Sequence, residues 1–255
     1  MTWAYRMHVD LDALEVHAAA FDAAGALGLS EEGGRATAWF DAPAADLPLP
    51  GTWEDLGERD WHAEYQRLLT PVTVGALTVV PPWADPLPQD ALIILPAQAF
   101  GTGHHETTTG CLAALQQVDL TGRRVLDVGT GSGVLAIAAA RLGAGAVLAV
   151  DTDPLACEAA ASNAALNAEA IEVRAGSVDA VWGVYDVLLA NLDTATLCRL
   201  AADLVARLAP GGTFVGAGVS LERVTEVLAA FEAAGLPLQV TAGREWAVLT
   251  ARRAG

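Results

Sequence analysis

The residues whose spacing most suggests chemistry form a glycine-rich loop in the sequence VLDVGTGSG, residues 125–133. An apolar run ends at Asp127, and three glycines follow at alternate positions, Gly129, Gly131 and Gly133. Glycines adopt positive φ angles easily and let a ligand approach the backbone, so this pattern predicts a strand, a tight turn and a helix that together hold a ligand. The loop alone does not identify the ligand, because dinucleotide-dependent enzymes carry a similar one.

The acidic residue before the loop narrows the choice of ligand. A carboxylate at Asp127 would repel a pyrophosphate, which the N-terminus of a helix otherwise attracts. It suits a ligand with a positive end instead. S-adenosylmethionine meets this requirement because it carries an ammonium and a sulfonium group and no phosphate.

A second acidic residue, Asp151, ends the next apolar run, 22 residues after Gly129. A carboxylate at this point of an α/β fold accepts hydrogen bonds from ribose hydroxyls. This feature supports a nucleoside without choosing between a dinucleotide and S-adenosylmethionine. The alternative is a helix cap, a role for which Asp153, immediately before Pro154, is the better candidate.

A third candidate is Asn191, which follows the apolar run Val187–Ala190 and would lie where the reacting atom sits. The chain contains only three asparagines, Asn163, Asn167 and Asn191, so each asks for a reason. Asn191 could alternatively cap the following helix, although Asp193 or Thr194 would serve equally well. His104 and His105 do not predict a metal site, because adjacent side chains diverge and no third ligand stands at useful spacing.

These residues need a framework that brings the ends of several strands together. From Leu77 onward short apolar runs alternate with helical patterns, which predicts an α/β fold with a doubly wound, mostly parallel sheet covered on both faces. The expected strands are Leu77–Val80, Ala91–Leu95, Val125–Val128, Ala146–Val150, Ile171–Val173, Val187–Ala190, Thr213–Ala217 and Ala247–Ala251. The expected helices cover residues 107–118, 132–142, 153–167, 194–208 and 221–234.

The N-terminal part of the chain predicts a separate small α+β domain over residues 1–52. Its pattern gives a strand over Trp3–Val9, a helix through Leu11–Phe21 that Gly25 and Gly28 end, and a strand over Ala36–Phe40. A proline-rich stretch then suggests a linker, and residues 53–70 predict an amphipathic helix, so that the catalytic domain would span residues 71–255. Residues 1–70 contain 13 acidic and 4 basic residues, a charge that favours a basic partner, although solubility alone would also explain it.

Composition excludes several classes of protein. The chain has no lysine, so it cannot be a P-loop nucleotide hydrolase, a protein kinase or a Schiff-base enzyme. Its three cysteines stand far apart, and no apolar run reaches the roughly 18 residues of a membrane span. No basic groove for nucleic acid is visible. We expect a soluble, monomeric, cytoplasmic protein that neither enters a membrane nor reads nucleic acid.

The same residues carry a family resemblance. Asp127, the glycines, Asp151, Asn191 and the sequence LAPGG at 208–212 resemble a class I methyltransferase. The segments FGTGHHETT (100–108), DWHAEY (60–65), PVTVGALTVVPPW (71–83) and ANL (190–192) resemble the PrmA family more specifically. That resemblance implies a seven-stranded, Rossmann-like methyltransferase sheet and S-adenosylmethionine as cofactor. It also implies an N-terminal domain that recognises the substrate and is joined by a flexible helical linker.

The resemblance further implies an activity and a set of site residues. The PrmA family methylates lysine side-chain and α-amino nitrogens of a basic large-subunit ribosomal protein, the eleventh of its series. The residues expected at the cofactor are Phe100, Gly101, Thr107, Thr108, Asp127, Gly129, Gly131, Asp151 and Asn191. Asn191 and Leu192 are expected to orient the amine. No residue is identified as a general base; His104, His105, Glu106 and Asp193 remain open.

Other functions stay possible at this point. The chain has Asn191-Leu192-Asp193-Thr194 where methyltransferases of glutamine or adenine carry Asn-Pro-Pro-aromatic, which disfavours planar amides or bases as substrates. A class I methyltransferase acting on another protein or on a small-molecule amine is the nearest alternative. A dinucleotide-dependent oxidoreductase and a binding protein without catalysis are more distant ones.

Overall fold

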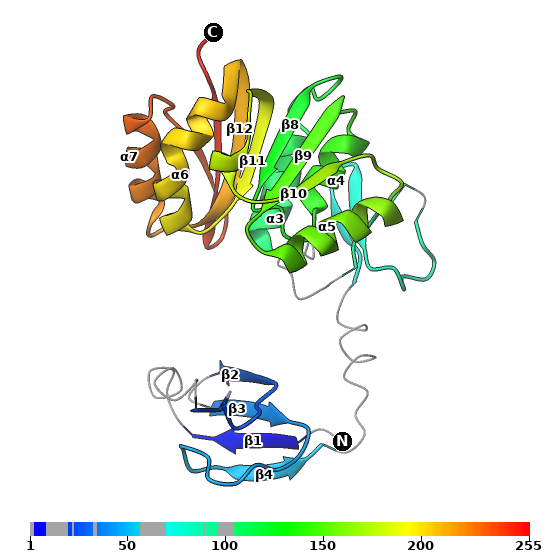
Figure 1. The fold of residues 1–255 in the computed structure, drawn as a ribbon, viewed down its shortest axis with the longest axis vertical. Helices are drawn as coiled ribbons and strands as arrows, with labels where there is room; N and C mark the ends of the chain where they lie inside the picture. Colours follow the sequence, from blue (N-terminus) through cyan, green and yellow to red (C-terminus); the bar gives the residue numbers. More distant parts are fainter. Residues whose placement is uncertain are drawn as a thin grey trace. The chain divides into compact units, whose positions relative to one another are not determined.

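The structure is a computed structural model, and it divides into two compact units, residues 1–68 and 69–255. It describes residues 3–8, 20–21, 23–32, 35–56, 70–88, 90–95 and 105–255. Figure 1 shows both units, each of which is described by itself below. Phe100, Gly101, His104, most of the helix expected through Leu11–Phe21 and residues 57–69 of the expected linker helix lie outside the described residues.

The first unit is built on a four-stranded antiparallel sheet in the order β2-β3-β1-β4. The strands are β1 (Trp3–Met7), β2 (Gly28–Glu32), β3 (Arg35–Phe40) and β4 (Thr52–Asp55). One face carries a small core, because side chains at alternate strand positions point to the same side. The buried members of this core are Tyr5, Met7, Phe21, Ala36, Ala38 and Phe40.

Two sequence-based expectations for this unit were wrong. Trp53 does not begin a helix: it lies in β4, where its ring packs against Tyr5 and Phe40 at centroid distances of 4.8 and 5.1 Å. The proline-rich stretch is not a free linker either, since Leu47 and Leu49 pack on the core and the Tyr5 hydroxyl donates to the Leu49 carbonyl at 3.0 Å. The first domain therefore extends at least to Asp55.

The second unit contains the predicted doubly wound α/β sheet. Seven strands lie in the order β10-β9-β8-β11-β12-β14-β13, and β14 is antiparallel to its two neighbours while the other adjacent pairs are parallel. Their bounds are β8 (Arg124–Val128), β9 (Ala146–Asp151), β10 (Glu172–Ala175), β11 (Tyr185–Asn191), β12 (Leu208–Ser220), β13 (Gln239–Ala242) and β14 (Trp246–Arg252). Strand order reverses between β8 and β11, and ligands of such sheets bind at this point, beyond the carboxyl ends of the strands.

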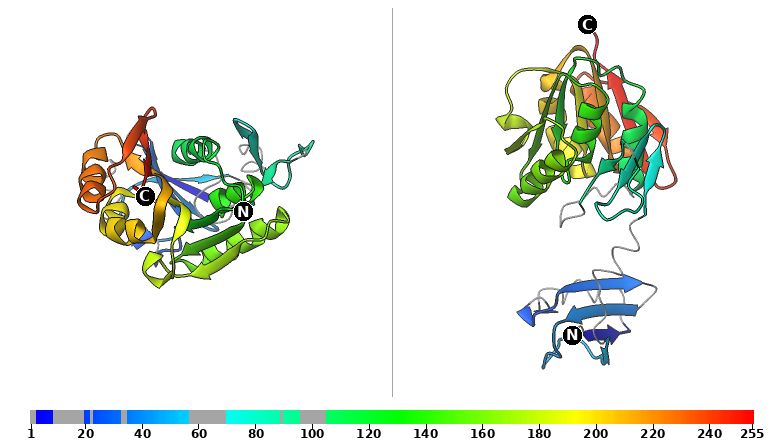
Figure 2. Two further views of the ribbon diagram at one scale, coloured as in Figure 1. Left: turned by 90° about the horizontal axis from the view of Figure 1, so that it is seen from above. Right: turned by 90° about the vertical axis from the view of Figure 1, so that its right-hand side faces the viewer.

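Helices cover both faces of this sheet, as Figure 2 shows. Alternate residues of β8 enter different cores: Val125 packs beneath α3, α4 and α5, whereas Leu126 packs beneath α6 and α7. This explains why the strands are continuously apolar in sequence. The helices are α3 (Glu106–Leu115), α4 (Val134–Arg141), α5 (Pro154–Leu166), α6 (Thr194–Arg207) and α7 (Val224–Ala233), and a 3-10 turn, η1, covers Val178–Ala180.

The first two strands expected for the large sheet belong elsewhere. A separate three-stranded sheet consists of β5 (Val72–Val74), β6 (Leu77–Val80) and β7 (Leu92–Ile93). Its buried residues pack into the core beneath α3 and α4, so apolar runs alone could not assign them to one sheet or the other. The seventh strand of the large sheet is β13, which the sequence did not reveal because all four of its residues are exposed. None of the helices in the described residues could cross a membrane.

Candidate active site

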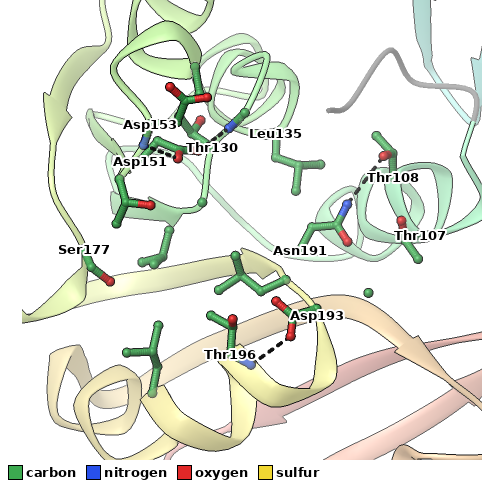
Figure 3. Close-up of a pocket in the computed structure, with 18 of the residues that line it drawn as sticks. Thr107, Thr108, Thr130, Leu135, Asp151, Asp153, Ser177, Asn191, Asp193 and Thr196 are labelled. Carbon is green, nitrogen blue, oxygen red and sulfur yellow. Dashed lines mark hydrogen bonds between the residues drawn. The ribbon is translucent and has the colours of Figure 1, made fainter. Parts of the chain in front are cut away.

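A pocket of about 620 Å³ opens at the carboxyl ends of β8, β9 and β11. Figure 3 shows that it is bordered by the loop after β8 on one side and by the first turn of α3 on another. The volume suits a ligand of nucleoside size or larger. Of the predicted site residues within the described part of the chain, Thr107, Thr108, Gly129, Gly131, Asp151, Asn191 and Leu192 line the pocket.

The glycine-rich loop forms the predicted turn between β8 and α4. Gly129, Gly131 and Gly133 have φ angles of +71°, +54° and +83°, a region that side-chain-bearing residues rarely adopt. The N–H groups of Gly129 and Thr130 donate to the Val150 carbonyl at 2.9 and 3.1 Å, which fixes the loop to the end of β9. The loop therefore presents backbone atoms directly to the pocket.

Asp127 does not line the pocket. Its side chain is 1% exposed and accepts a hydrogen bond from the Thr130 hydroxyl at 2.7 Å. Burial, together with the charge of Asp151, raises the pKa of Asp127 to about 7 against the hydrogen bonds from Thr130 and the backbone of Ala136. Asp127 thus lies beneath the glycine-rich loop. The sequence led us to expect direct contact with the ligand, and this buried position does not favour it.

Asp151 lies at the end of β9 and reaches into the pocket (Figure 3). One carboxylate oxygen accepts from the Gly131 N–H at 2.9 Å and the other from the Asp153 N–H at 3.0 Å. Each oxygen keeps a further lone pair, which leaves the carboxylate able to accept two more hydrogen bonds. The helix cap that could have explained this residue is Asp153, whose side chain accepts from the Leu155 N–H.

Across the pocket, Asn191 meets the first turn of α3. Its Nδ2 donates to the Thr108 hydroxyl at 3.5 Å, so Oδ1 is the atom left to accept a hydrogen bond from a ligand (Figure 3). Asn191 does not cap α6, because Asp193 does so by accepting from the Thr196 N–H. Thr107 and Thr108 are 1% and 0% exposed, so neighbouring side chains and backbone enclose both residues of this wall.

Leu192 is fixed between two glycines. A Cβ on Gly129 would lie 2.2 Å from the Leu192 Cδ2 atom, and a Cβ on Gly218 would lie 2.2 Å from the Leu192 carbonyl oxygen. Both distances are far below van der Waals contact. At Gly218 the clash is with backbone atoms, so only glycine fits there, whereas at Gly129, with a φ of +71°, an added Cβ would displace the Leu192 side chain. The two glycines therefore allow Leu192 to pack closely against the glycine-rich loop and against β12.

Sequence reasoning missed part of the pocket wall. Ser177 follows β10, Thr196 and Arg199 project from α6, and Trp246 begins β14. Their residue types are common on any surface, so no pattern in the sequence distinguished them. Within the described residues, no group of three or more His, Cys, Asp or Glu side chains could hold a metal ion.

Comparison with known proteins decides the family. The family model for ribosomal protein L11 methyltransferase (PrmA) matches residues 40–254. A ribosomal protein L11 methyltransferase from Deinococcus radiodurans is 41% identical over 269 residues, covering 98% of each chain, and one from Thermus thermophilus is 40% identical over 254 residues, covering 97% of this chain and 98% of the other. The chain belongs to the PrmA family. A solved ribosomal protein L11 methylase from Lactobacillus delbrueckii subsp. bulgaricus superposes with a TM-score of 0.68 at 30% identity, over 72% of this chain and 99% of that chain.

Membership of the PrmA family makes this chain a methyltransferase that uses S-adenosylmethionine. The pocket fits that cofactor: a carboxylate stands at the end of β9 for a ribose, and the loop after β8 exposes its backbone. The three carboxylates on the wall, Asp151, Asp153 and Asp193, favour a ligand that carries positive charge.

Among the described residues, the PrmA site offers little support for a general base, and His104, the fourth candidate, lies outside them. Glu106 accepts hydrogen bonds from the backbone N–H groups of Arg244 and Glu245, in the turn between β13 and β14, and it does not line the pocket. His105 lines the pocket, but its Nδ1 accepts from the Thr107 N–H at 3.3 Å. A backbone N–H can only donate, so a neutral His105 carries its proton on Nε2. Hydrogen bonds from Thr196 lower the pKa of Asp193, which makes it a weak base.

Proposed function

We propose that this chain methylates lysine side-chain and α-amino nitrogens of ribosomal protein L11 in the cytoplasm. The observation that carries the proposal is the near-complete alignment, over 98% of both chains, with a relative named for that activity. Because the alignment includes the N-terminal unit as well as the catalytic one, the similarity extends to any part that recognises the substrate. A monomer without direct contact to RNA is the form that we expect to act.

We assign the cofactor-binding roles as follows. Asp151 accepts hydrogen bonds from the ribose, and the backbone of Gly129 and Gly131 borders the cofactor on the side of β8. Thr107, Thr108 and Asn191 surround its methionine end, with Asp127 acting from beneath the loop. Phe100 and Gly101 join this set on their sequence alone.

Methyl transfer is an in-line displacement, for which S-adenosylmethionine supplies the methyl group and a good leaving group. The chain must hold a neutral amine about 3 Å from that methyl group and exclude water. The Oδ1 atom of Asn191 is placed to accept an amine hydrogen, because Nδ2 is already engaged by Thr108. Leu192, which packs against Gly129 and Gly218, fixes the position of the backbone next to Asn191.

The proton of the amine is the main energetic obstacle. A lysine with a pKa near 10.4 costs about 4.6 kcal/mol to present as a neutral amine at pH 7, whereas an α-amino group costs only about 1 kcal/mol. Removal from water lowers the cost of neutralising the lysine. We infer that the substrate loses its proton to solvent, since the three candidate bases that the structure describes, Glu106, His105 and Asp193, are all unsuited to take it.

The N-terminal unit suits a basic partner by its charge. Residues 1–70 carry 13 acidic and 4 basic side chains, which would attract a basic ribosomal protein and speed its encounter. If this attraction contributes, kcat/KM for L11 falls as the salt concentration rises, mainly through KM. A salt-independent kcat/KM would contradict this part of the proposal.

The test is transfer of labelled methyl groups from S-adenosylmethionine to purified L11. Asp151→Ala is expected to abolish labelling, whereas Asp203→Ala, an exposed carboxylate on α6 outside the pocket, leaves it intact. Mass spectrometry of the labelled L11 identifies the modified nitrogens. In a parallel assay with a cell extract, label could enter only RNA, another protein or a small-molecule amine. That result would support methyltransferase activity but refute L11 as the substrate.

A further inference from the structure

Helix α5 and the residue that caps its C-terminus provide two buried asparagines one turn apart, and neither lines the pocket. Asn163 and Asn167 are 1% and 8% exposed. A carboxamide presents one acceptor and one donor side by side, as a peptide group does, so it can pair with the edge of a strand. Buried polar side chains are costly unless their hydrogen bonds are made, which makes the partners of these two residues informative.

Both asparagines pair with the backbone around β7. Asn167 accepts from the Ile93 N–H at 2.8 Å and donates to the Ile93 carbonyl at 2.6 Å. Asn163 does the same with Leu95, at 2.8 and 3.4 Å. In an extended strand the N–H and carbonyl groups of alternate residues, here Ile93 and Leu95, point to the same side. The two asparagine side chains therefore make the hydrogen bonds that a neighbouring strand would otherwise make. To this extent the two residues are equivalent.

They differ in one contact. Nδ2 of Asn163 also donates to the carbonyl of Ser132, in the glycine-rich loop, at 2.9 Å. Nδ2 of Asn167 donates instead to the carbonyl of Asn163, within its own helix, at 2.7 Å. The peptide between Ser132 and Gly133 is thereby held at both ends, because the Gly133 N–H donates to the Thr130 carbonyl at 2.9 Å.

A second contact supports the loop from the same helix. A Cβ on Gly133 would lie 3.1 Å from both Cα and Cβ of Ala160, so the loop backbone rests directly on α5 one turn before Asn163. On the pocket side, the Gly131 N–H is bonded to Asp151 at 2.9 Å. The loop is thus fixed between the carboxylate that faces the pocket and the asparagine that lies behind it.

We propose that Asn163 is a positioning residue for the cofactor: it orients the Ser132–Gly133 peptide and so holds the glycine-rich loop in the conformation that binds S-adenosylmethionine. Asn167 anchors β7 without this role. If both asparagines only stabilised the fold, substitution of either one would lower stability, and neither substitution would change the affinity for the cofactor. The two asparagines therefore form a matched pair on one helix.

The experiment compares Asn163→Ala with Asn167→Ala. Both variants are expected to melt at lower temperature, because each leaves backbone groups of the segment around β7 without partners. The dissociation constant of S-adenosylhomocysteine, measured by calorimetry well below the melting temperature, should rise about tenfold for Asn163→Ala, the effect of one lost hydrogen bond. For Asn167→Ala it should change less than about twofold.

A second pair separates the donor from the acceptor. Asn163→Asp and Asn167→Asp keep an oxygen for the N–H groups of Leu95 and Ile93 but lose the donated hydrogen bonds, and the difference in affinity should persist. Asn163→Ser, in which water can replace the carboxamide, provides the comparison if the alanine variant does not fold. Equal changes in the dissociation constant at both positions, or no change at Asn163, would overturn the proposal.

Discussion

Asp127 is the buried carboxyl whose titration should dominate the pH dependence of stability in the catalytic unit. Its pKa rises from 3.8 to about 7 on folding, chiefly through burial. A carboxyl whose pKa is raised in the folded protein destabilises the fold wherever it would ionise in the unfolded chain. The penalty begins above pH 3.8 and reaches its full size once the pH passes 7. Stability therefore falls as the pH rises through this interval.

The size of the penalty follows from the two pKa values. It is about 2 kcal/mol at pH 5 and about 4 kcal/mol at pH 8, at 1.36 kcal/mol for each unit of pKa. Asn in place of Asp127 removes this pH dependence while keeping the shape and an oxygen for the Thr130 hydroxyl. Relative to the wild type, Asp127→Asn should therefore gain about 2–3 kcal/mol of stability between pH 5 and pH 8.

Thermal unfolding of the two proteins without cofactor, at pH 5, 6, 7 and 8, measures this gain. For a domain of this size the difference in Tm between variant and wild type should widen by roughly 5–10 °C across the series. The comparison cancels the titration of all other groups. A difference in Tm that stays constant with pH would show that Asp127 has the same pKa in the folded and unfolded chain. A difference that narrows as the pH rises would show that folding favours the charged carboxylate. Either result would refute the reasoning.

Three further predictions concern cofactor binding and the fate of the amine proton. Gly129→Ala should raise the dissociation constant of S-adenosylhomocysteine at least about tenfold, because the new Cβ displaces Leu192; Gly122→Ala, at a similar φ of +69° with open space around it, should leave the constant unchanged. Glu106→Gln should lower Tm by about 2–4 °C and keep the shape of the kcat/KM profile against pH, whereas the loss of an inflection on the acidic limb would identify Glu106 as a base. Methylation of lysine in L11, followed by mass spectrometry, should rise about tenfold per pH unit from 6 to 9 while α-amino methylation levels off near pH 8. A lysine rate that levels off below pH 8 would reveal a base in the protein.

The sequence predicted those features that depend on short stretches of chain. The strands Val125–Val128 and Val187–Ala190 were found because burial on both faces of the sheet makes them apolar at every position but Asp127. The turn at the glycine-rich loop followed from local φ requirements. Asp151 and Asn191 were found by their places at strand ends, and both line the pocket.

Features that depend on distant contacts could not be predicted in this way. Trp53 has helical spacing with later apolar residues, yet its place in β4 is set by pairing with Tyr5, 48 positions earlier. Asp127 was expected to face the ligand because it precedes the glycines; whether a strand-end side chain points into the pocket or beneath the loop depends on the pleat, which the sequence does not display. The role of Arg199 in the pocket wall likewise arises only when α6 is folded against the sheet.

The asparagines show how the rarity of a residue can carry information. All three asparagines of the chain contact either the pocket or the loop and strand that support it. The physical reason is common to Asn163 and Asn167: their positions need a short, neutral side chain that donates and accepts at once. Aspartate lacks the donor and would bury a charge, glutamine is one methylene too long for the same backbone spacing, and serine cannot reach both groups of a peptide. A composition that disfavours asparagine leaves it where these substitutes fail, and this reasoning makes the loss of cofactor affinity in Asn163→Asp the most direct check of the argument.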